Sequence, residues 1–238
     1  MSKPSAAVES RSTMSDAIRT AHHYHDWVFS SFSDQLRPGT ALEVGSGHGK
    51  YSRKLAPLVE HLFVSDIDPV AVRAIETELA DLPRVTCLTM NGIEADKLPG
   101  PVDNIVLVNL LEHIADDVGM LRACREVLHP GGKLLLFVPA FPELFSVMDK
   151  EAGHHRRYRR KGLVELVERV GFRVTASRMF NAVGFFGWYV NKWMGSEVNS
   201  ASTNAQVGLY NRLIPVLKHA DRVLPFLGQS VVLAAHKM

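Results

Sequence analysis

The sequence predicts an α/β fold in which short buried strands alternate with helices. An apolar run ends at Val44 and is followed by a turn with three glycines and by a helical pattern over 51–58. A second extended run, over 61–65, delivers Asp66 about 20 residues after the glycines. Strand and helix patterns continue to alternate along the chain, which favours a mostly parallel sheet with helical crossovers.

Composition restricts the class of protein. With 238 residues and 46% hydrophobic content, the chain can form one sizeable core, so we expect a single main domain. A formal net charge of +2 is too small to indicate a nucleic-acid partner. Cys87 and Cys124 are the only cysteines and lie in apolar, regular segments, which argues against a disulfide framework. Neither a secretory signal nor a transmembrane segment is recognisable, so we expect a cytoplasmic protein.

The N-terminal segment precedes the first strand. Residues 1–13 are rich in serine and alanine and are expected to fray. An apolar stripe then runs to Leu36 and predicts a helix laid over the core. His22, His23 and His25 on this helix point in different directions around its axis, which favours a polar face over a metal site. We therefore divide the chain into a segment with a cap helix, 1–37, and a main domain, 38–238.

The glycine turn over 45–49 is suited to hold a polar ligand against the main chain. Its glycines permit close approach, and the helix that begins near Lys50 offers unpaired N–H groups. The spacing is G-x-G-x-G, and Lys50 stands where the dinucleotide fingerprint has its third glycine, which argues against NAD. Tyr51 stands where a P-loop has Ser or Thr, which argues against that motif.

Asp66 is the second candidate ligand-binding feature. In doubly wound sheets an acidic side chain at this place accepts hydrogen bonds from ribose hydroxyls. Asp68 followed by Pro69 is instead typical of an N-cap with proline at the first helical position. A solvated loop carboxylate is the alternative for Asp66, but the preceding glycine turn favours the ribose role.

The remaining elements follow in order. The patterns predict helices over 69–82, 116–127 and 162–170, and strands over 85–90, 104–108, 133–138 and 172–179. Residues 180–193 are aromatic with interspersed glycines and have no clean period, and 195–205 is polar. An amphipathic helix interrupted by Pro215 and Pro225 is expected over 209–227, followed by a last strand over 230–235.

Four ordered motifs resemble those of the class I S-adenosylmethionine-dependent methyltransferases. They are Glu43-x-Gly45-x-Gly47-x-Gly49, then Asp66, then the run over 102–114 and the run over 128–134. The resemblance extends from about Tyr24 to the C-terminus. It implies a Rossmann-like three-layer sandwich with a mostly parallel seven-stranded sheet whose last strand is antiparallel. It also implies an N-terminal helical cap and a helical lid insertion over about 180–228, before the last strand.

The resemblance further implies the cofactor S-adenosyl-L-methionine, the product S-adenosyl-L-homocysteine, and methyl transfer to a small-molecule acceptor. A tyrosine in the leading helix of such enzymes often closes over the cofactor, which makes Tyr24 a candidate. Asn91 stands where related enzymes more commonly have Asp near the adenine, and Asn109 is expected near the methionine portion. The expected cofactor-binding residues are Tyr24, Glu43, Gly45, Gly47, Gly49, Asp66, Ile67, Asn91, Gly92 and Asn109.

The stretch over 139–161 leaves the end of a central strand and is expected to overhang the pocket. It resembles a bacterial methyltransferase subgroup with a recurring Asp, a Gly-His pair and an Arg-Tyr pair, matched here by Asp149, Gly153-His154 and Arg157-Tyr158. His155 stands where that subgroup more often has an aromatic residue. His154 is the candidate base of this stretch, because an imidazole can accept a proton from an acceptor group.

Asp149, His154 and His113 are the expected catalytic residues, with a structural role equally open for His113. Arg157, Tyr158, Phe185 and Trp188 are the expected substrate-binding residues, and they favour an amphiphilic or anionic acceptor. For the basic residues over 159–161 a solvated helix cap is favoured. The sequence offers no clean metal-ligand spacing, so no metal is expected.

Two other functions remain open. The first is a nicotinamide-dependent oxidoreductase, against which stand Lys50 and the lack of a Tyr-x-x-x-Lys pair. The second is a non-catalytic cofactor-binding or partner-binding module that uses the aromatic segment over 185–193. This segment is also a candidate for a lid, a homodimer contact or a membrane-surface contact.

Overall fold

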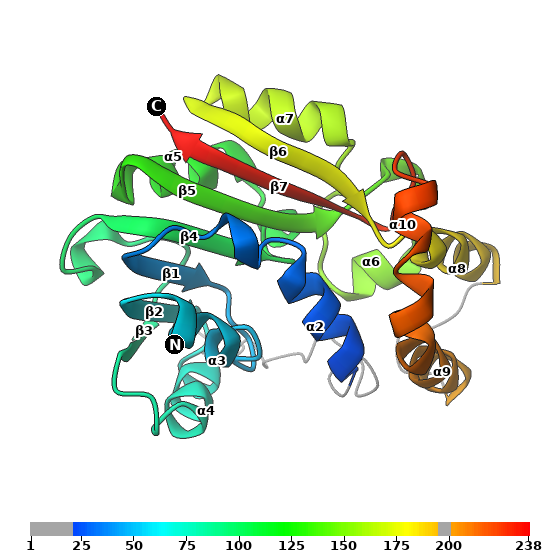
Figure 1. Cartoon of the computed structure of the whole chain (residues 1–238), viewed down its shortest axis with the longest axis horizontal. Helices are drawn as coiled ribbons and strands as arrows, with labels where there is room; N and C mark the ends of the chain where they lie inside the picture. Colours follow the sequence, from blue (N-terminus) through cyan, green and yellow to red (C-terminus); the bar gives the residue numbers. More distant parts are fainter. Residues whose placement is uncertain (1–20, 195–200) are drawn as a thin grey trace, which may run out of the picture.

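The computed structural model describes residues 21–194 and 201–238, with side chains described over 21–189 and 208–238. The expected α/β architecture is confirmed, because one seven-stranded sheet lies between helices on both of its faces (Figure 1). The strand order is β3-β2-β1-β4-β5-β7-β6. The expected fraying of residues 1–13 lies outside the described residues.

All strands of the sheet run parallel except β7, the last strand in the chain. Neighbouring strands from β3 to β5 pair in parallel, whereas β7 is antiparallel to both β5 and β6. The expected antiparallel strand at the end of the chain is thereby confirmed. The strands are β1 (Thr40–Val44), β2 (His61–Asp66), β3 (Val85–Thr89), β4 (Val102–Val108), β5 (Leu128–Pro139), β6 (Phe172–Phe180) and β7 (Ser230–Lys237).

The helices of the described residues connect these strands or cover their carboxyl ends. They are α2 (His22–Ser30), α3 (Ser52–Leu55), α4 (Pro69–Glu78), α5 (Asp117–Val127), α6 (Val147–Glu151), α7 (Arg160–Arg169), α8 (Ala182–Met194), α9 (Ala201–Leu217) and α10 (Ala220–Val223). The leading helix ends at Ser30, earlier than expected, and a short 3-10 turn over Ser33–Gln35 leads into β1.

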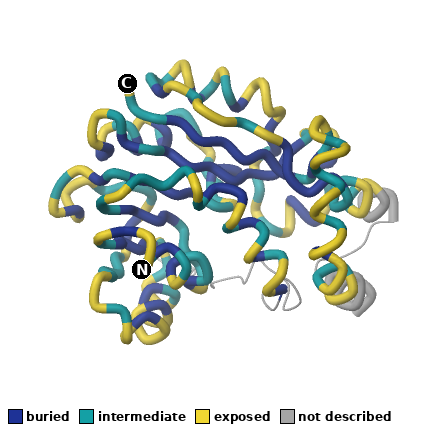
Figure 2. Tube along the Cα trace, viewed as in Figure 1, coloured by how far each residue is buried: buried dark blue, intermediate teal, exposed yellow. Residues whose placement is uncertain are grey.

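Two apolar layers hold the sheet between its helices. On one face, Leu121 of α5 and Leu163 of α7 pack with inward side chains of the strands. On the other face, Val28 of α2, Leu55 of α3 and Ile75 of α4 do the same. Strands β1, β2, β4, β5 and β7 are accordingly the most deeply buried part of the trace (Figure 2), and burial on both faces explains why they read as apolar runs.

β5 begins earlier than expected. The sequence predicts this strand over 133–138, yet Leu128 already pairs with Val102. The register then shifts, so that Asn104 pairs with Lys133. The extra residues of β5 form an irregularity within the strand, which sequence periodicity does not reveal.

The aromatic segment after β6 is a helix, α8, which the sequence pattern does not predict. Asn181 adopts a positive φ of 67°, and its side-chain oxygen accepts a hydrogen bond from the Gly184 N–H at 2.7 Å. The Asp221 carboxylate accepts a further one from the Ala182 N–H at 2.8 Å. α8 therefore begins at a well-capped end, although its apolar composition gives no amphipathic signal.

The polar stretch over 195–205 falls partly outside the described residues. α9 begins at Ala201, earlier than the expected 209, and continues through Pro215 to Leu217. α10 follows it before Pro225. The expected interruption at Pro215 is therefore wrong, because the helix continues through this proline, and the break lies between Leu217 and Ala220.

The topology determines where a ligand binds. The chain leaves β1 toward β2 on one side, and β4 lies on the other side of β1, so the strand order reverses there. In open α/β sheets the crevice beyond the carboxyl ends of such strands is the binding site. Helices α2, α6 and α8 gather at this end of the sheet (Figure 1).

Candidate active site

The glycine turn after β1 lies at the strand-order reversal. Gly45 and Gly47 have positive φ values of 71° and 56°. A Cβ on Gly45 would lie 2.6 Å from a methyl carbon of Leu110, which belongs to the loop after β4. A Cβ on Gly47 would meet nothing within 4 Å. The turn is therefore closely packed on its β4 side and open above Gly47.

Asp66 lies directly against this turn. The Gly47 N–H donates a hydrogen bond of 2.9 Å to one carboxylate oxygen, and the Asp68 N–H donates one of 3.0 Å to the other. Ser65, the residue before Asp66, accepts two further hydrogen bonds through its carbonyl, from the N–H groups of Gly45 and Ser46. The glycine turn and Asp66, which the sequence predicts to bind the same ligand, are thus in direct contact.

Glu43 lies buried beneath the turn. It is 2% exposed, and the Ser52 hydroxyl donates a hydrogen bond of 2.5 Å to its carboxylate. Burial, opposed by that hydrogen bond and assisted by the nearby Asp66 charge, raises the pKa of Glu43 to about 7. A cation bound nearby would favour the ionised form of Glu43.

Tyr24 contributes to a group of phenols beside the turn. The hydroxyl of Tyr51 and His25 Nδ1 lie 3.0 Å apart, and His25 Nε2 lies 3.2 Å from Lys50 Nζ. Tyr24 is anchored by its backbone N–H, which donates to Asn211 of α9 at 3.1 Å. Burial raises the pKa values of Tyr24 and Tyr51 well above the usual range, so both phenols stay neutral.

The other expected cofactor-binding residues lie at the ends of neighbouring strands. Asp66 pairs with Thr89 of β3, so the loop that carries Asn91 and Gly92 begins beside it. Ile67 leaves 63% of its surface exposed. Asn109 follows β4, has a positive φ of 49° and donates its N–H to the Phe137 carbonyl at 2.8 Å.

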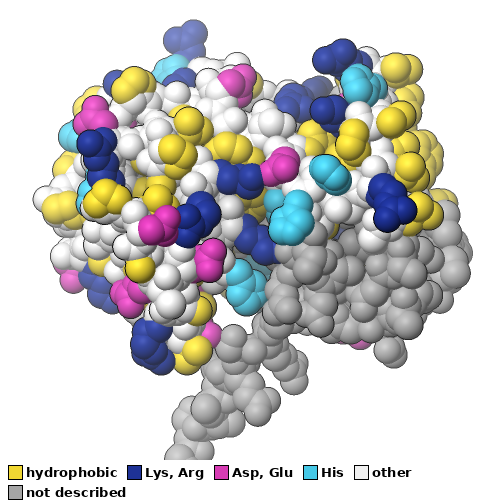
Figure 3. Space-filling model, turned by 60° about the horizontal axis from the view of Figure 1, so that its bottom comes forward, with side chains coloured by type: hydrophobic (Ala, Val, Ile, Leu, Met, Phe, Trp, Pro, Cys, Tyr) yellow, Lys and Arg dark blue, Asp and Glu magenta, His cyan; other side chains and the backbone are white. Residues whose placement is uncertain are grey.

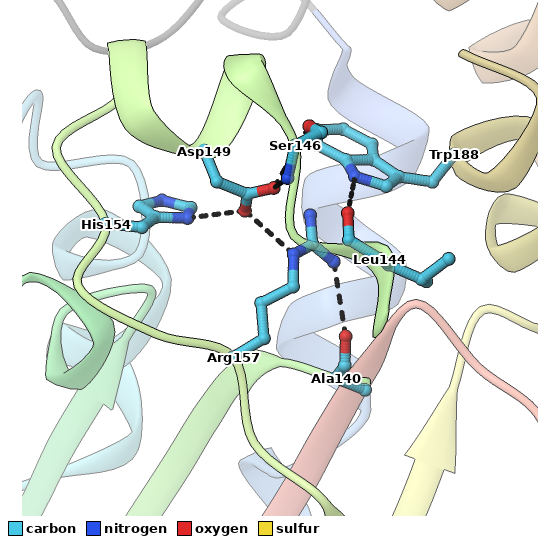
Figure 4. A network of polar contacts seen from close by, with 7 residues as sticks. All are labelled: Ala140, Leu144, Ser146, Asp149, His154, Arg157 and Trp188. Atoms are coloured by element: carbon cyan, nitrogen blue, oxygen red, sulfur yellow. Dashed lines mark hydrogen bonds and ion pairs between the residues drawn. The ribbon is translucent and has the colours of Figure 1, made fainter. Parts of the chain in front are cut away.

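The expected catalytic Asp149 is the centre of a buried polar network (Figure 4). One oxygen lies 2.8 Å from His154 Nδ1 and 2.8 Å from Arg157 Nε. The other accepts hydrogen bonds from the Ser146 N–H and hydroxyl, at 2.9 and 3.1 Å. Burial alone would raise the pKa of Asp149, but the hydrogen bonds from His154 and Arg157 and the Arg157 charge hold it below the usual value. Asp149 is therefore a carboxylate that orients His154.

His113 and His154 lie next to each other. Their ring centroids are 4.7 Å apart in an edge-to-face arrangement. Burial, together with the neighbouring His154, lowers the pKa of His113 to about 4, so His113 is neutral. Glu112 lies beside the two rings. One carboxylate oxygen of Glu112 and one ring nitrogen of each histidine all lie within 4.8 Å of one another. Histidines also gather with acidic and basic side chains near the middle of the face shown in Figure 3.

The expected substrate-binding residues separate into two kinds. Arg157 is 5% exposed, and its remaining contacts are the Ala140 carbonyl at 3.2 Å and the Trp188 ring, 4.7 Å from its guanidinium carbon. Tyr158 is 7% exposed, and its hydroxyl donates to the Asp117 carboxylate at 3.1 Å. Both side chains are satisfied within the chain, which favours structural roles over the expected acceptor contacts.

The aromatic residues of α8 are more accessible. Phe185 packs edge-to-face on Phe141, with ring centroids 5.1 Å apart, and stacks on Tyr189. Trp188 donates its indole N–H to the Leu144 carbonyl at 3.3 Å, which joins α8 to the loop after β5. Among the basic residues, Arg159 pairs with Glu143 on the surface, as expected for a solvated cap.

Sequence reasoning missed Glu112, Tyr51 and Tyr210 as parts of the site. Tyr51 and Tyr210 read as amphipathic-helix positions, and their phenols meet Tyr24 only in the folded chain. Glu112 precedes His113 in a segment that reads as a helix start. The Glu112-His113 pair and the Gly153-His154 pair were both visible, but no spacing rule joins them.

Part of the chain matches a known protein family. A family model described as a methyltransferase domain matches residues 42–134. This range contains the glycine turn, Asp66, Asn91, Asn109 and His113, and it ends before the Asp149 network.

The chain is similar to curated and solved proteins of the same kind. It is 30% identical over 104 residues to the ubiquinone biosynthesis O-methyltransferase of Xanthomonas euvesicatoria, covering 43% of this chain and 44% of the relative. The chain thus spans less than half the length of the curated relatives it matches. N-methyltransferase NodS from Bradyrhizobium japonicum, solved with S-adenosyl-L-homocysteine, has a TM-score of 0.57 at 14% identity, covering 94% and 88% of the two chains. Magnesium protoporphyrin IX methyltransferase from Synechocystis has a TM-score of 0.58 at 16% identity, covering 93% and 86%.

Proposed function

We propose that this chain, whose residues 42–134 match a methyltransferase domain, transfers a methyl group from S-adenosyl-L-methionine to a nucleophilic atom of a small-molecule acceptor. The observation that carries the proposal is the 2.9 Å hydrogen bond between Gly47 and Asp66. It joins a glycine turn to an acidic strand end at the point where the strand order reverses, which is where a nucleoside ligand fits.

The residues present fit the adenosyl end of the cofactor. A carboxylate oxygen has two lone pairs, so Asp66 can accept ribose hydroxyls in addition to its two backbone N–H groups. The exposed Ile67 offers an apolar surface for the adenine ring, and the Asn91 amide offers both a donor and an acceptor. The open space above Gly47 leaves room for the ligand.

The methionine end of the cofactor carries an ammonium and a sulfonium, both positive. Glu43 lies within the carboxyl end of β1 and can supply the negative charge that favours them. Tyr24 and Tyr51 would contribute neutral phenol groups around this end. Asn109, at the end of β4, lies on the opposite side of the strand-order reversal and would line the same crevice.

When bound, S-adenosyl-L-methionine supplies an already electrophilic methyl carbon, so the chain needs only to orient and deprotonate the acceptor. The ionised Asp149 accepts a hydrogen bond from the Nδ1–H group of His154, which leaves the lone pair on Nε2 available. We assign this Nε2 atom to the activation of the acceptor's nucleophile. Asp149 is the positioning residue, and Arg157 keeps it ionised.

The accessible aromatic side chains favour an acceptor with an apolar portion. Phe141 and Phe185 come from the loop after β5 and from α8, next to the Asp149 network. Arg157 is fully engaged by Asp149, Ala140 and Trp188, which weakens the argument for an anionic group on the acceptor. An amphiphilic acceptor therefore fits these residues better than a purely anionic one.

Three further expectations remain predictions. They are the cytoplasmic location, a homodimer, and the lack of a nucleic-acid partner. Across residues 21–194 and 201–238, none of the helices has the length and apolar character needed to cross a bilayer.

Two titrations test the proposal. Calorimetry with S-adenosyl-L-methionine should show binding, whereas a parallel absorbance titration with NADH should not, because Lys50 replaces the third glycine of the dinucleotide fingerprint. Transfer of radiolabel from the methyl donor into the small-molecule fraction of a cell extract should follow. Binding of S-adenosyl-L-methionine without transfer into any fraction would favour a non-catalytic module. Binding of NADH alone would favour a nicotinamide-dependent oxidoreductase.

A further inference from the structure

Three potential metal ligands meet beside the proposed acceptor site, from segments about 40 residues apart. Glu112 and His113 follow β4, and His154 follows α6. One ligand atom from each lies within 4.8 Å of the others. The backbone holds the two segments together, because the His155 N–H donates to the Glu112 carbonyl at 2.8 Å.

Glu112 is the most unusual member of this group. Its side chain is 0% exposed, and neither carboxylate oxygen accepts a hydrogen bond from another described residue. A buried carboxylate with no partner is costly, whether it is ionised or neutral, so such groups are normally paired or bound to a cation. The positive charge that acts on Glu112, on Arg157, is already bonded to Asp149 and Ala140.

Both histidines are oriented as metal ligands usually are. A ligating histidine typically donates its other ring N–H to a carboxylate or a backbone carbonyl, which directs the remaining lone pair at the metal. His154 has Asp149 at 2.8 Å from Nδ1. The ring of His113 is hydrogen-bonded to the backbone of Gly153. Each ring thus retains one nitrogen for a ligand.

We infer that Glu112, His113 and His154 bind one divalent transition-metal ion, for which Zn²⁺ is the best match. Two imidazoles and one carboxylate form a set that zinc accepts with a fourth position left open. Imidazole ligands disfavour Mg²⁺ and Ca²⁺, which prefer oxygen. Bonds of about 2.0–2.2 Å would bring the ligand atoms to about 3.5 Å from one another, so separations of up to 4.8 Å would close by at most about 1.3 Å.

Binding of the ion does not depend on the proposed activity, but its role in the reaction rests on it. The open position would take the oxygen of an acceptor hydroxyl and lower its pKa, as zinc does for water. The hydroxyl proton would pass to solvent. The oxygen lone pair would then form the new bond to the methyl carbon while the carbon–sulfur bond breaks, its electrons staying on sulfur. In this arrangement His154 would activate the acceptor's nucleophile through the ion, in place of removing its proton directly.

Metal stoichiometry is the direct test. The full chain, first dialysed against a chelator, is equilibrated with Zn²⁺ and analysed by elemental mass spectrometry. We expect one tightly bound equivalent per chain. Replacement by Co²⁺ should give visible absorption bands of a low-coordinate site with nitrogen and oxygen ligands.

Variants identify the ligands. Glu112→Gln keeps the shape of the side chain and removes no hydrogen bond, so it should fold and lose zinc affinity by at least about 100-fold. His113→Gln should do the same. His155→Gln is the matched control, because His155 is exposed, adjacent to His154 and outside the ligand group. It should bind zinc like the parent chain.

Asp149→Asn tests the orientation of His154 and should weaken zinc binding about 10- to 100-fold. Less than about 0.2 equivalents of bound zinc in the parent chain, or an unchanged affinity in Glu112→Gln, would overturn the inference. A loss of zinc affinity in His155→Gln as large as that in Glu112→Gln would also overturn it. Calorimetry with S-adenosyl-L-methionine on the same samples reports the proposed function separately, since the cofactor-binding residues lie outside the ligand group.

Discussion

The Gly47 N–H donates a 2.9 Å hydrogen bond to the Asp66 carboxylate, so β1 and β2 are joined directly beyond their carboxyl ends. The contact keeps the carboxylate at one fixed place beside the glycine turn. A ligand that fits the turn therefore meets Asp66 without any rearrangement of the loop. This preorganisation is what a tightly held nucleoside requires.

Replacement of this carboxylate should weaken cofactor binding. Asp66→Ala removes the acceptor for the ribose hydroxyls and for two backbone N–H groups, so we expect the Kd for S-adenosyl-L-methionine to rise at least about 10-fold. Isothermal titration calorimetry measures this. Asp68→Asn is the control, because Asn caps α4 as well as Asp does, and it should leave the Kd within about twofold. An unchanged Kd in Asp66→Ala would contradict the assignment of the site.

The two glycines of the turn should respond differently to the same change. Gly45→Ala would bring its Cβ to 2.6 Å from Leu110 at a positive φ, so the free energy of unfolding should fall by about 2–4 kcal/mol. Gly47→Ala has the same backbone strain but no contact, and about 1–2 kcal/mol is expected. Urea unfolding compares the two. Equal losses would show that the packing against Leu110 is unimportant.

Much of the fold could be predicted, because parallel strands that are buried on both faces can be recognised in the sequence as apolar runs. β1, β2 and β4 were located on that basis, and the antiparallel direction of the last strand, β7, came from the resemblance. α8 could not be recognised, since a helix that is apolar nearly all round has no period to detect. The early start of β5 depends on an irregular pairing with β4, which only the partner strand reveals.

The candidate site was predictable where it follows strand ends and obscure where it depends on long-range contacts. Asp66 and the glycine turn are visible as a pattern, and they meet as expected. Arg157 was interpreted as an anion-binding residue, yet its partner is Asp149, which lies eight positions away in the sequence. Glu112 became a candidate only through its burial against the segment that carries His155.

Asp149→Asn should reduce turnover while leaving the cofactor in place. The amide cannot fix the His154 tautomer as the carboxylate does, so we expect kcat to fall about 100-fold or more. The Kd for S-adenosyl-L-methionine should change by less than about threefold, because Asp149 lies outside the glycine turn. Arg157 would lose its buried partner, and stability should fall by about 3–5 kcal/mol.

Steady-state kinetics and calorimetry at a temperature well below the unfolding transition separate these effects. Ser146→Ala serves as the comparison, since it removes the hydroxyl that donates to the other Asp149 oxygen. It should keep turnover within about threefold. A loss of turnover in Ser146→Ala as large as in Asp149→Asn would point to a general disturbance of the loop.

Phe185→Ala should weaken acceptor binding specifically. Its ring packs on Phe141 and forms part of the accessible aromatic surface of α8. Removal of an aromatic contact of this kind should raise the acceptor KM about 5- to 20-fold, with kcat and the cofactor Kd little changed. Phe186→Ala, on the next and more exposed residue, is the comparison and should have a smaller effect. Identical KM values for the parent chain and Phe185→Ala would remove α8 from the acceptor site.

The stability of the protein should fall as pH rises through the range set by Glu43. Burial raises the pKa of Glu43 from 4.5 to about 7, so between these values the folded chain retains a proton that the unfolded chain has released. The unfolded state then binds fewer protons than the folded state, and the free energy of unfolding decreases with pH. A shift of this size corresponds to about 3 kcal/mol, lost progressively from about pH 4.5 to pH 7.

Glu43→Gln should remove this dependence, because the amide does not titrate and its oxygen can still accept the Ser52 hydroxyl. The stability of Glu43→Gln relative to the parent chain should therefore increase by about 3 kcal/mol between pH 4.5 and pH 8. Urea unfolding at several pH values measures the difference. S-adenosyl-L-methionine, whose charges favour the ionised carboxylate, should stabilise the parent chain more at pH 7.5 than at pH 5.5, and this trend should be weaker in Glu43→Gln. If the free energy of unfolding depended on pH in the same way in both proteins, the pKa of Glu43 would not differ between the folded and unfolded states as its burial requires.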